Sequence, residues 1–420
     1  MAGLVAEDGE TLVNAYVKID VDNHVTAIIP HSEMGQGAQT ALTQMLADEL
    51  DAEWSSVSFM EAPAEDDYAN WALGKGYLAG DADVPESLVP SLDGAFMAIA
   101  SAMHMQITGG SLSVRTTGVT GMRVAGAAAR EMLVAAAAEA WGVPPSEITT
   151  RNSHLVHEAS GRDATYAEFA AAAGEMTPPR SPALKTPDQF RLMGKSVARR
   201  DIPSKVDGTA AFGIDADVPG MKYAAIIGAP VFGAEVASVD AAAAEAMAGV
   251  DRIVTLDNAV AVVADGYWRA SQALSKVKVQ WTSTPNDGLD SDAIFAQFDR
   301  DLDAARAGGE STADVEQGDV AGAFSGADQI VEATYRVPWL AHTCMEPMNA
   351  TARVEDGTCE IWVGSQNPPW ATATRLPPRW RWRSRTSSST STSWAAASAD
   401  ARRRTRRFRP RASRARSAPP

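Results

Sequence analysis

The stretch "HSEMGQGAQT", residues 31–40, decides how the first part of this chain folds. It follows an alternating apolar segment that predicts a strand, and it leads into residues 38–50, whose apolar spacing predicts a helix. Gly35 and Gly37 let a ligand approach the backbone of the turn, and the helix start offers N–H groups with partial positive charge. Gln36 between them carries both donors and an acceptor. The stretch predicts either a polar-ligand site or an ordinary strand-to-helix turn.

A second glycine turn, "TGGSLSVR" at residues 108–115, precedes a helix predicted over residues 122–141. Its paired glycines and hydroxyls can form another nest for an anion or an amide. The residues concerned are Gly109, Gly110, Ser111 and Ser113. The alternative is an ordinary Gly-Gly-Ser loop, so this turn strengthens the prediction of a ligand site only modestly.

Two further polar residues are candidates for a site. Glu346 in "HTCMEPMN" lies between apolar residues, where a carboxylate can become a pKa-shifted acid or orient a ligand. The alternative is a charge at a strand end. Gln366 in "GSQNPPW" lies on a turn stiffened by proline, which is also its structural explanation. His31 and His342 are more typical of hydrogen-bonded structural imidazoles than of catalysts.

The charge of the chain is unevenly distributed. The formal net charge is −16, but the residues from 371 onward contain 14 Arg against one acid, Asp400. The preceding 370 residues therefore carry 23 basic and 52 acidic side chains, a net charge of −29. A body this acidic repels nucleic acid and anionic membrane surfaces, so we expect neither as its partner.

Cysteine content and hydropathy exclude several classes of protein. Cys344 and Cys359 are the two cysteines, and no Cys-x-x-Cys motif occurs, which argues against an iron–sulfur cluster or four-cysteine zinc site built from this chain alone. We expect two free thiols and no metal site. No apolar run reaches transmembrane length, and the first residues lack signal-peptide features. The sequence as given therefore predicts a cytoplasmic chain.

The segment pattern predicts an α+β protein with several domains. We expect a first domain over residues 12–178, ended by a Pro-rich linker, and a second over 195–282, where strands alternate with Ala-rich helices. A third region begins at 327 and runs to 371, and residues 372–420 form a tail of different composition.

Several strands are predicted from alternating apolar residues. They include residues 12–21 in the first domain, 210–218 in the second and 329–338 in the third. Residues 70–105 are predicted as a helical insertion.

Taken in order, "SEMGQG", "TGGSLSVR", "AGAAAREML", "KVDGTAAFGIDADVPGM", "PVFGAEVAS", "HTCMEPMNATA" and "SQNPPW" resemble the large subunits of the molybdenum hydroxylases, the xanthine dehydrogenase and aldehyde oxidase family. The most similar branch is that of the isoquinoline 1-oxidoreductase beta subunit and its aldehyde-dehydrogenase relatives. The resemblance extends from about Asn14 to Trp370. It implies a molybdopterin-binding subunit in which residues 195–282 form an α/β hammerhead domain and residues 327–371 begin a second molybdopterin-binding domain.

The resemblance also implies the cofactor and partner. The cofactor would be a molybdenum–pterin dinucleotide, of the cytosine form, and a separate small subunit would carry two [2Fe-2S] clusters. The cradle would consist of Met34, Gly35, Gln36, Gly37, Gly109, Gly110, Ser111 and Ser113. Glu346 and Gln366 would line the substrate pocket or support it.

The reaction that the resemblance implies is hydroxylation of an electron-poor carbon, in an N-heterocycle or an aldehyde, with oxygen from water. The family's base glutamate lies near the C-terminus of chains about twice as long, so Glu346 is not that base and no catalytic residue is assigned here. We therefore expect a truncated chain, inactive alone. Many relatives carry an export signal and are periplasmic.

The tail stretch "TSTSWAAASADARRRTRRFRP", residues 390–410, departs from the family pattern. Read one base earlier, with GC-rich codons, "WAAASADA" at residues 394–401 is compatible with Leu-Gly-Gly-Gly-Phe-Gly-Arg-Arg, a loop that the family has there. We therefore predict a frameshift beginning around residues 372–376 and a disordered tail. Two alternatives stay open: a genuine Arg-rich arm that binds nucleic acid, and a non-catalytic cofactor-binding or scaffold fragment.

Overall fold

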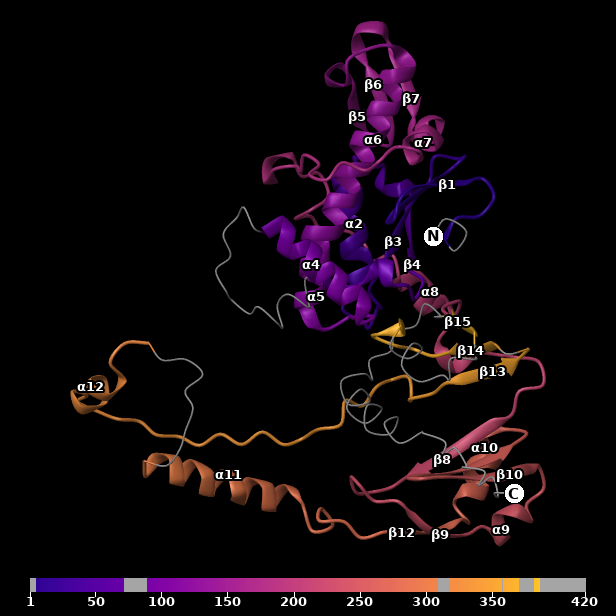
Figure 1. The fold of residues 1–420 in the computed structure, drawn as a ribbon, viewed down its shortest axis with the longest axis vertical. Coiled ribbons are helices and arrows are strands. Elements are labelled where there is room, and N and C mark those ends of the chain that lie inside the picture. Colours follow the sequence, from indigo (N-terminus) through magenta and orange to yellow (C-terminus); the bar gives the residue numbers. More distant parts are fainter. Residues whose placement is uncertain (1–4, 72–88, 309–316, 357, 370–380, 386–420) are drawn as a thin grey trace, which may run out of the picture. The chain divides into compact units, whose positions relative to one another are not determined.

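A computed structural model of the chain describes residues 5–71, 89–308, 317–356, 358–369 and 381–385. Helices and strands occur together, as the sequence predicts for an α+β chain. The chain divides into two compact units, the first containing residues 1–216 and 342–420 and the second residues 217–341 (Figure 1). This division differs from the three domains expected, whose boundaries stay predictions.

The first unit is built around a four-stranded sheet with the order β1-β2-β3-β4. Its strands are β1 (Glu10–Asn14), β2 (Val17–Asp20), β3 (Val25–Ile29) and β4 (Val57–Glu61). The first three pair antiparallel, whereas β3 and β4 are parallel and are connected through α2 (Ala38–Leu50), which has the predicted helix bounds. The "HSEMGQGAQT" stretch is thus the turn from a parallel strand into its crossover helix.

The prediction of one strand over residues 12–21 is wrong. The chain reverses after Asn14, and its two halves pair with each other in the sheet. The side-chain Oδ1 of Asn14 accepts a hydrogen bond of 2.9 Å from the Tyr16 N–H, which closes a turn of the kind that Asn favours. The apolar alternation runs through this turn and conceals it.

Helix α6 (Arg123–Trp141) packs against α2 and confirms the helix predicted over residues 122–141. Together with the sheet they enclose the main core, in which Leu42, Leu46 and Leu133 are fully buried. The helices approach closely at Gly126, where an added Cβ would lie 2.4 Å from the Leu46 carbonyl oxygen. Helix α6 continues from α5 (Gly110–Thr117) through a π-helical turn, Gly118–Met122.

The remaining elements of the first unit lie around this core. They are α4 (Val89–Ala102), β5 (Thr149–Arg151), β6 (His154–His157), β7 (Arg162–Thr165), α7 (Tyr166–Gly174), α8 (Ile202–Asp207), β13 (Thr351–Glu355), β14 (Thr358–Trp362) and β15 (Arg381–Arg385). Strands β5 to β7 form an antiparallel meander beside α6 and α7 (Figure 1). Helix α4 is the described part of the predicted helical insertion.

The predicted tail lies almost entirely outside the described residues. The exception is β15, which pairs parallel with β14 in the sheet β13-β14-β15. These five residues therefore differ from the disorder expected over 372–420, and the rest of that prediction is not addressed by the structure.

The stretch predicted as a Pro-rich linker is anchored to the first unit. The Lys185 Nζ lies 2.7 Å from Asp51 Oδ1 and also contacts the buried carboxylate of Asp48. Arg191 donates its backbone N–H to the same Asp48. The Lys185 ammonium and the Arg191 N–H offset the cost of burying carboxylates at the end of α2 and hold this segment against the core.

The second unit contains a three-stranded antiparallel sheet, β10-β11-β8, and a two-stranded one, β12-β9. Its elements are β8 (Tyr223–Gly228), β9 (Val236–Asp240), α9 (Ala242–Glu245), β10 (Val250–Leu256), β11 (Ala259–Ala264), α10 (Tyr267–Leu274), β12 (Lys278–Trp281), α11 (Ser291–Arg306) and α12 (Val320–Ser325). The strand and helix alternation expected within 195–282 is present, and the name hammerhead stays a prediction.

Two further strand predictions are wrong. Residues 210–218 contain a 3-10 turn, Gly213–Asp215, because the Asp215 carboxylate accepts the Phe212 N–H at 2.9 Å. Residues 329–338 are extended but pair with no strand in the described part of the chain, and Tyr335 there is 89% exposed. An extended segment becomes a strand only when a neighbour satisfies its backbone groups.

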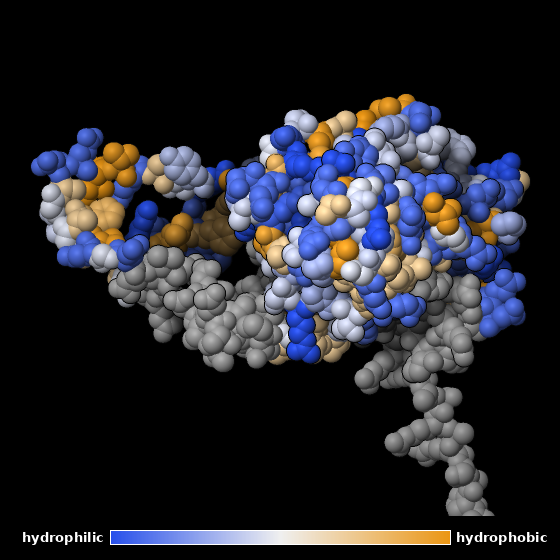
Figure 2. Space-filling view, turned by 90° about the horizontal axis from the view of Figure 1, so that it is seen from above, coloured by the Kyte–Doolittle hydropathy of each residue, from blue (hydrophilic) through white to orange (hydrophobic). Residues whose placement is uncertain are grey.

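The surface seen in Figure 2 is mainly hydrophilic, with hydrophobic residues scattered over it in small patches. Small scattered patches of this kind are ordinary on a folded protein.

Candidate cofactor-binding site

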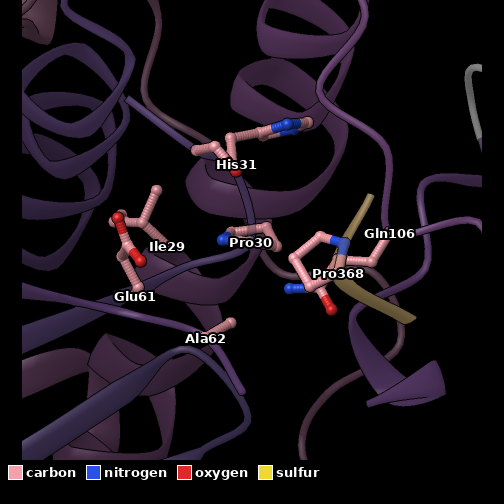
Figure 3. Close-up of a pocket in the computed structure, with 8 residues that line it drawn as sticks. Ile29, Pro30, His31, Glu61, Ala62, Gln106 and Pro368 are labelled. Carbon is pink, nitrogen blue, oxygen red and sulfur yellow. The ribbon is translucent and has the colours of Figure 1, made fainter. Parts of the chain in front are cut away.

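A pocket lies at the carboxyl ends of the parallel strands β3 and β4 (Figure 3). It is small and open to solvent: its cavity volume is about 10 Å³, room for about one water molecule. Its lining residues are Ile29, Pro30, His31, Ser32, Glu61, Ala62, Gln106 and Pro368. This edge is where sheets with parallel strands and crossover helices commonly bind ligands.

His31 connects the end of β3 to the second glycine turn. Its Nδ1 lies 3.1 Å from Thr108 Oγ1, and its Nε2 lies 2.8 Å from Thr117 Oγ1. The ring is 2% exposed, and burial lowers the pKa of His31 to about 4. The imidazole is therefore neutral at pH 7, and the prediction of a structural histidine is confirmed.

Gln366 is brought directly to the "TGGS" turn. The Thr108 N–H donates to the Gln366 carbonyl at 2.7 Å, and Gln366 Nε2 donates to the Thr108 carbonyl at 2.8 Å. Next to this pair, Ser32 Oγ donates to the Ser365 carbonyl at 2.7 Å, and the Ser32 N–H donates to Thr108 Oγ1 at 2.9 Å. Three distant stretches of sequence therefore meet at one edge of the pocket.

The first glycine turn has the backbone form that its sequence predicts. Gly35 and Gly37 have φ angles of +90° and +80°, a region that favours glycine. The side chain of Gln36 folds back on the turn, accepting from the Met34 N–H and donating to the Ser32 carbonyl at 2.9 Å. In this form of the turn, the amide of Gln36 holds the loop together instead of reaching outward, which its sequence position could not reveal.

The second glycine turn opens α5, and the two helix starts differ. Gly109 is the extended residue before the helix, and no described side chain caps α5. Ser111 is exposed at its first turn, whereas the structure does not describe the side chain of Ser113.

Two buried amides next to this junction have unpaired polar atoms. Gln106, 4% exposed, lines the pocket with its Oε1 buried and without a hydrogen-bond partner among the described residues. Asn367 is 1% exposed, and in the described part of the chain neither its Nδ2 nor its Oδ1 has a partner. An unpaired buried polar group costs about 1–3 kcal/mol, so the pocket is suited to a ligand that supplies the missing hydrogen bonds. A heterocycle with donors and acceptors along its edge fits this requirement.

Sequence reasoning missed Gln106 and Asn367 although both are close to residues it selected. Gln106 precedes Thr108 by two positions, and Asn367 follows Gln366. A single amide side chain has no spacing signature, and only the pairing of the two segments shows that these are buried. The sequence signal for these two residues is only their position next to a predicted motif.

Glu346 connects two other motifs. Its Oε1 accepts from the Ile214 N–H at 3.0 Å and from Asn349 Nδ2 at 2.9 Å. Gly213 is needed at this contact because an added Cβ would lie 3.0 Å from Asn349 Oδ1. Glu346 does not line the pocket of Figure 3, so its place near the substrate stays a prediction.

The described residues contain no group of three or more His, Cys, Asp and Glu side chains placed to hold a metal ion. In the same part of the chain, no helix combines the length and the apolar character needed to cross a membrane. Cys344 and Cys359 are both free thiols, as predicted.

Comparisons with known proteins indicate which cofactor the family of this chain binds. Residues 305–375 match the family described as molybdopterin cofactor-binding domain. The beta chain of isoquinoline 1-oxidoreductase from Brevundimonas diminuta is 31% identical over 84% of this chain and 47% of its own length. A membrane-bound aldehyde dehydrogenase (pyrroloquinoline-quinone) of Gluconacetobacter polyoxogenes is 30% identical over 86% of this chain and 43% of its own length.

The chain belongs to the family of molybdenum hydroxylase large subunits. It spans about half the length of the two relatives named. Among solved structures, quinoline 2-oxidoreductase from Pseudomonas putida 86 matches 45% of this chain and 30% of its own, with 18% identity and a TM-score of 0.32, too low to carry an argument. The family assignment favours an oxidoreductase component over a nucleic-acid binder acting through the Arg-rich tail.

Proposed function

We propose that this chain is the cofactor-binding part of a molybdenum-dependent oxidoreductase that hydroxylates N-heterocycles or oxidises aldehydes with water as the oxygen source. The observation that carries the proposal is the pocket at the ends of β3 and β4, where Thr108 and Gln366 pair beside the unpaired amide of Gln106. The family of the chain supplies the reaction class.

Different residues at the pocket would bind different parts of the cofactor. Gln106 Oε1 accepts a hydrogen bond from an N–H on the cofactor edge, which relieves its unpaired state. The backbone of Gly109 and Gly110, at the start of α5, would lie next to the negatively charged end. Gly35 leaves its side of the turn open, since an added Cβ there would meet no atom within 4 Å. The bound molybdenum–pterin group, in its cytosine dinucleotide form, supplies the redox chemistry.

The proposed partner is a small subunit with two [2Fe-2S] clusters that takes the electrons onward. The absence of a Cys-x-x-Cys motif from the sequence supports a separate carrier. The matching chains of isoquinoline 1-oxidoreductase and of nicotinate dehydrogenase from Pseudomonas putida are each named as one subunit of their enzyme, which also supports an assembly.

The proposal predicts that Gly35→Val lowers cofactor occupancy severalfold, because a β-branched side chain both strains φ = +90° and fills the open side of the turn. The measurement is molybdenum and pterin per chain after purification from a host that makes the cofactor. The matched control is Gly161→Val, since Gly161 also has a positive φ, of 64°, and open space around it. Equal occupancy in the two variants would leave Gly35 a purely structural turn residue.

We also propose that the chain from about residue 372 is translated in a shifted reading frame. The codon compatibility of residues 394–401 with a glycine-rich loop supports this. The nucleotide sequence from codon 365 onward tests it: a one-base shift should open a long frame that encodes three consecutive glycines. Codons for Ala395 to Ala397 that give no glycine run in that frame would contradict the proposal.

A further inference from the structure

The buried carboxylate of Glu33 organises the first glycine turn. Its Oε1 accepts from the Gly35 N–H at 2.9 Å and the Gly37 N–H at 2.8 Å, and its Oε2 accepts from the Gln39 N–H at 3.2 Å. The Glu33 side chain is buried, 2% exposed, so these N–H groups replace the water that its carboxylate has lost. A side chain of the protein itself therefore occupies the position at the start of α2 that an anion would take.

Arg199 completes this arrangement from a distant part of the chain. Its Nη2 lies 3.3 Å from Glu33 Oε1, and its Nη1 donates to the Gly35 carbonyl at 2.9 Å. The guanidinium is itself held by Asp201, at 2.6 and 3.0 Å. Burial alone would raise the pKa of Asp201, but the hydrogen bonds from Arg199 and Lys205 outweigh it and hold the pKa at about 2. Asp201 is thus ionised at neutral pH and keeps Arg199 in place.

These contacts fix both sides of the turn. Glu33 holds its N–H groups, Arg199 holds its Gly35 carbonyl, and Gly37 is favoured because its φ is +80°. Without the carboxylate, the N–H groups of Gly35, Gly37 and the buried Gln39 would lose their acceptor, and the positive-φ backbone would lose its support.

We propose that Glu33 and Arg199 are positioning residues that hold the Gly35–Gly37 turn in the form that admits the cofactor. This inference rests on the proposed function. It assigns no direct cofactor contact to either residue, because both are engaged by the turn itself. It also places the anionic end of the ligand away from the start of α2, where the Glu33 carboxylate would repel it.

The test compares Glu33→Gln with the wild-type chain. The substituted amide can still accept from Gly35 and Gly37 with its oxygen, but its NH₂ would then take the place of Oε2 and face the Gln39 N–H, which is a donor too. Hydrogen exchange at the amides of Gly35, Gly37 and Gln39 should accelerate roughly ten- to hundredfold, as expected for loss of a charge-assisted hydrogen bond. Molybdenum and pterin per chain should fall severalfold.

Arg199→Gln is the second variant, because Arg199 is one-third exposed and its replacement leaves the core intact. Arg199→Gln should accelerate hydrogen exchange at the same amides, and it should lower molybdenum and pterin per chain less than Glu33→Gln does. Glu10→Gln is the matched control: it removes a carboxylate from the ion pair with Lys18, at 2.6 Å, on β1. In this control, hydrogen exchange at the turn and the content of molybdenum and pterin should stay at the wild-type level.

The outcomes separate this inference from the proposed function. A wild-type chain without molybdenum or pterin contradicts the proposed function. A wild-type chain that holds the cofactor, with exchange and occupancy unchanged in Glu33→Gln and Arg199→Gln, overturns the positioning role. Faster exchange with full occupancy also overturns it, because the turn would then be ordered by Glu33 without governing the cofactor.

Discussion

Gly126→Ala should lower the free energy of unfolding of the first unit by about 3 kcal/mol, as overpacking of a close helix contact does. The added Cβ would lie 2.4 Å from the Leu46 carbonyl oxygen and 3.1 Å from Glu49 Cβ. A backbone oxygen cannot rotate away as a side chain can, so α2 and α6 must separate. Denaturant unfolding followed by fluorescence of Trp54 and Trp141 measures the loss.

The matched control for this prediction is Gly121→Ala. Gly121 precedes α6 in the same helical run, and its added Cβ would meet only Thr117 Cγ2, at an ordinary 3.5 Å. We expect this variant to be neutral or more stable by up to about 1 kcal/mol, the usual gain from replacing a helical glycine. If Gly126→Ala were as stable as Gly121→Ala, the close α2–α6 contact would be wrong.

The first unit should lose about 3 kcal/mol of stability through His31 as the pH falls from 6.5 to 4. The pKa of His31 is lowered by burial from 6.5 to about 4, so the unfolded chain binds the proton first. The contribution of His31 to the free energy of unfolding is complete above pH 6.5, and it is lost as the pH falls through the folded-state pKa of about 4. Both ring nitrogens face the hydroxyls of Thr108 and Thr117, so protonation would also disturb the junction at the pocket.

Comparison with His31→Gln isolates this effect, because every other titrating group is common to both proteins. The difference in the free energy of unfolding between pH 7 and pH 4 should be smaller in the variant by the contribution of His31. Parallel pH profiles for the two proteins would show that the imidazole is not buried in the neutral form.

The long helices were predictable because their apolar periodicity extends over many residues. Residues 38–50 and 122–141 each present a continuous apolar face, and the structure places them with almost the same bounds. The strand over 12–21 failed because alternation continues through the Asn14 turn. The strand over 329–338 failed because strand formation depends on a partner, which no local pattern reveals.

The conformation of the glycine turn at the site was predictable, but the contacts that bring distant segments together there were not. Positive φ at Gly35 and Gly37 follows from a tight turn between strand and helix. The pairing of Thr108 with Gln366 joins residues 258 positions apart, and such a contact leaves no trace in local spacing. Glu33 lies inside the motif itself, but nothing in its spacing predicts that its carboxylate is buried and accepts from three N–H groups.

The central claim, that this chain binds a molybdenum–pterin cofactor, is tested most directly by its content of molybdenum and pterin. The wild-type chain would be purified from a host that makes the cofactor, with metal measured by mass spectrometry and pterin by fluorescence after release. The account predicts both in equal molar amounts, at a substantial fraction of one per chain. Neither metal nor pterin above the level of an unrelated protein purified in parallel would contradict it.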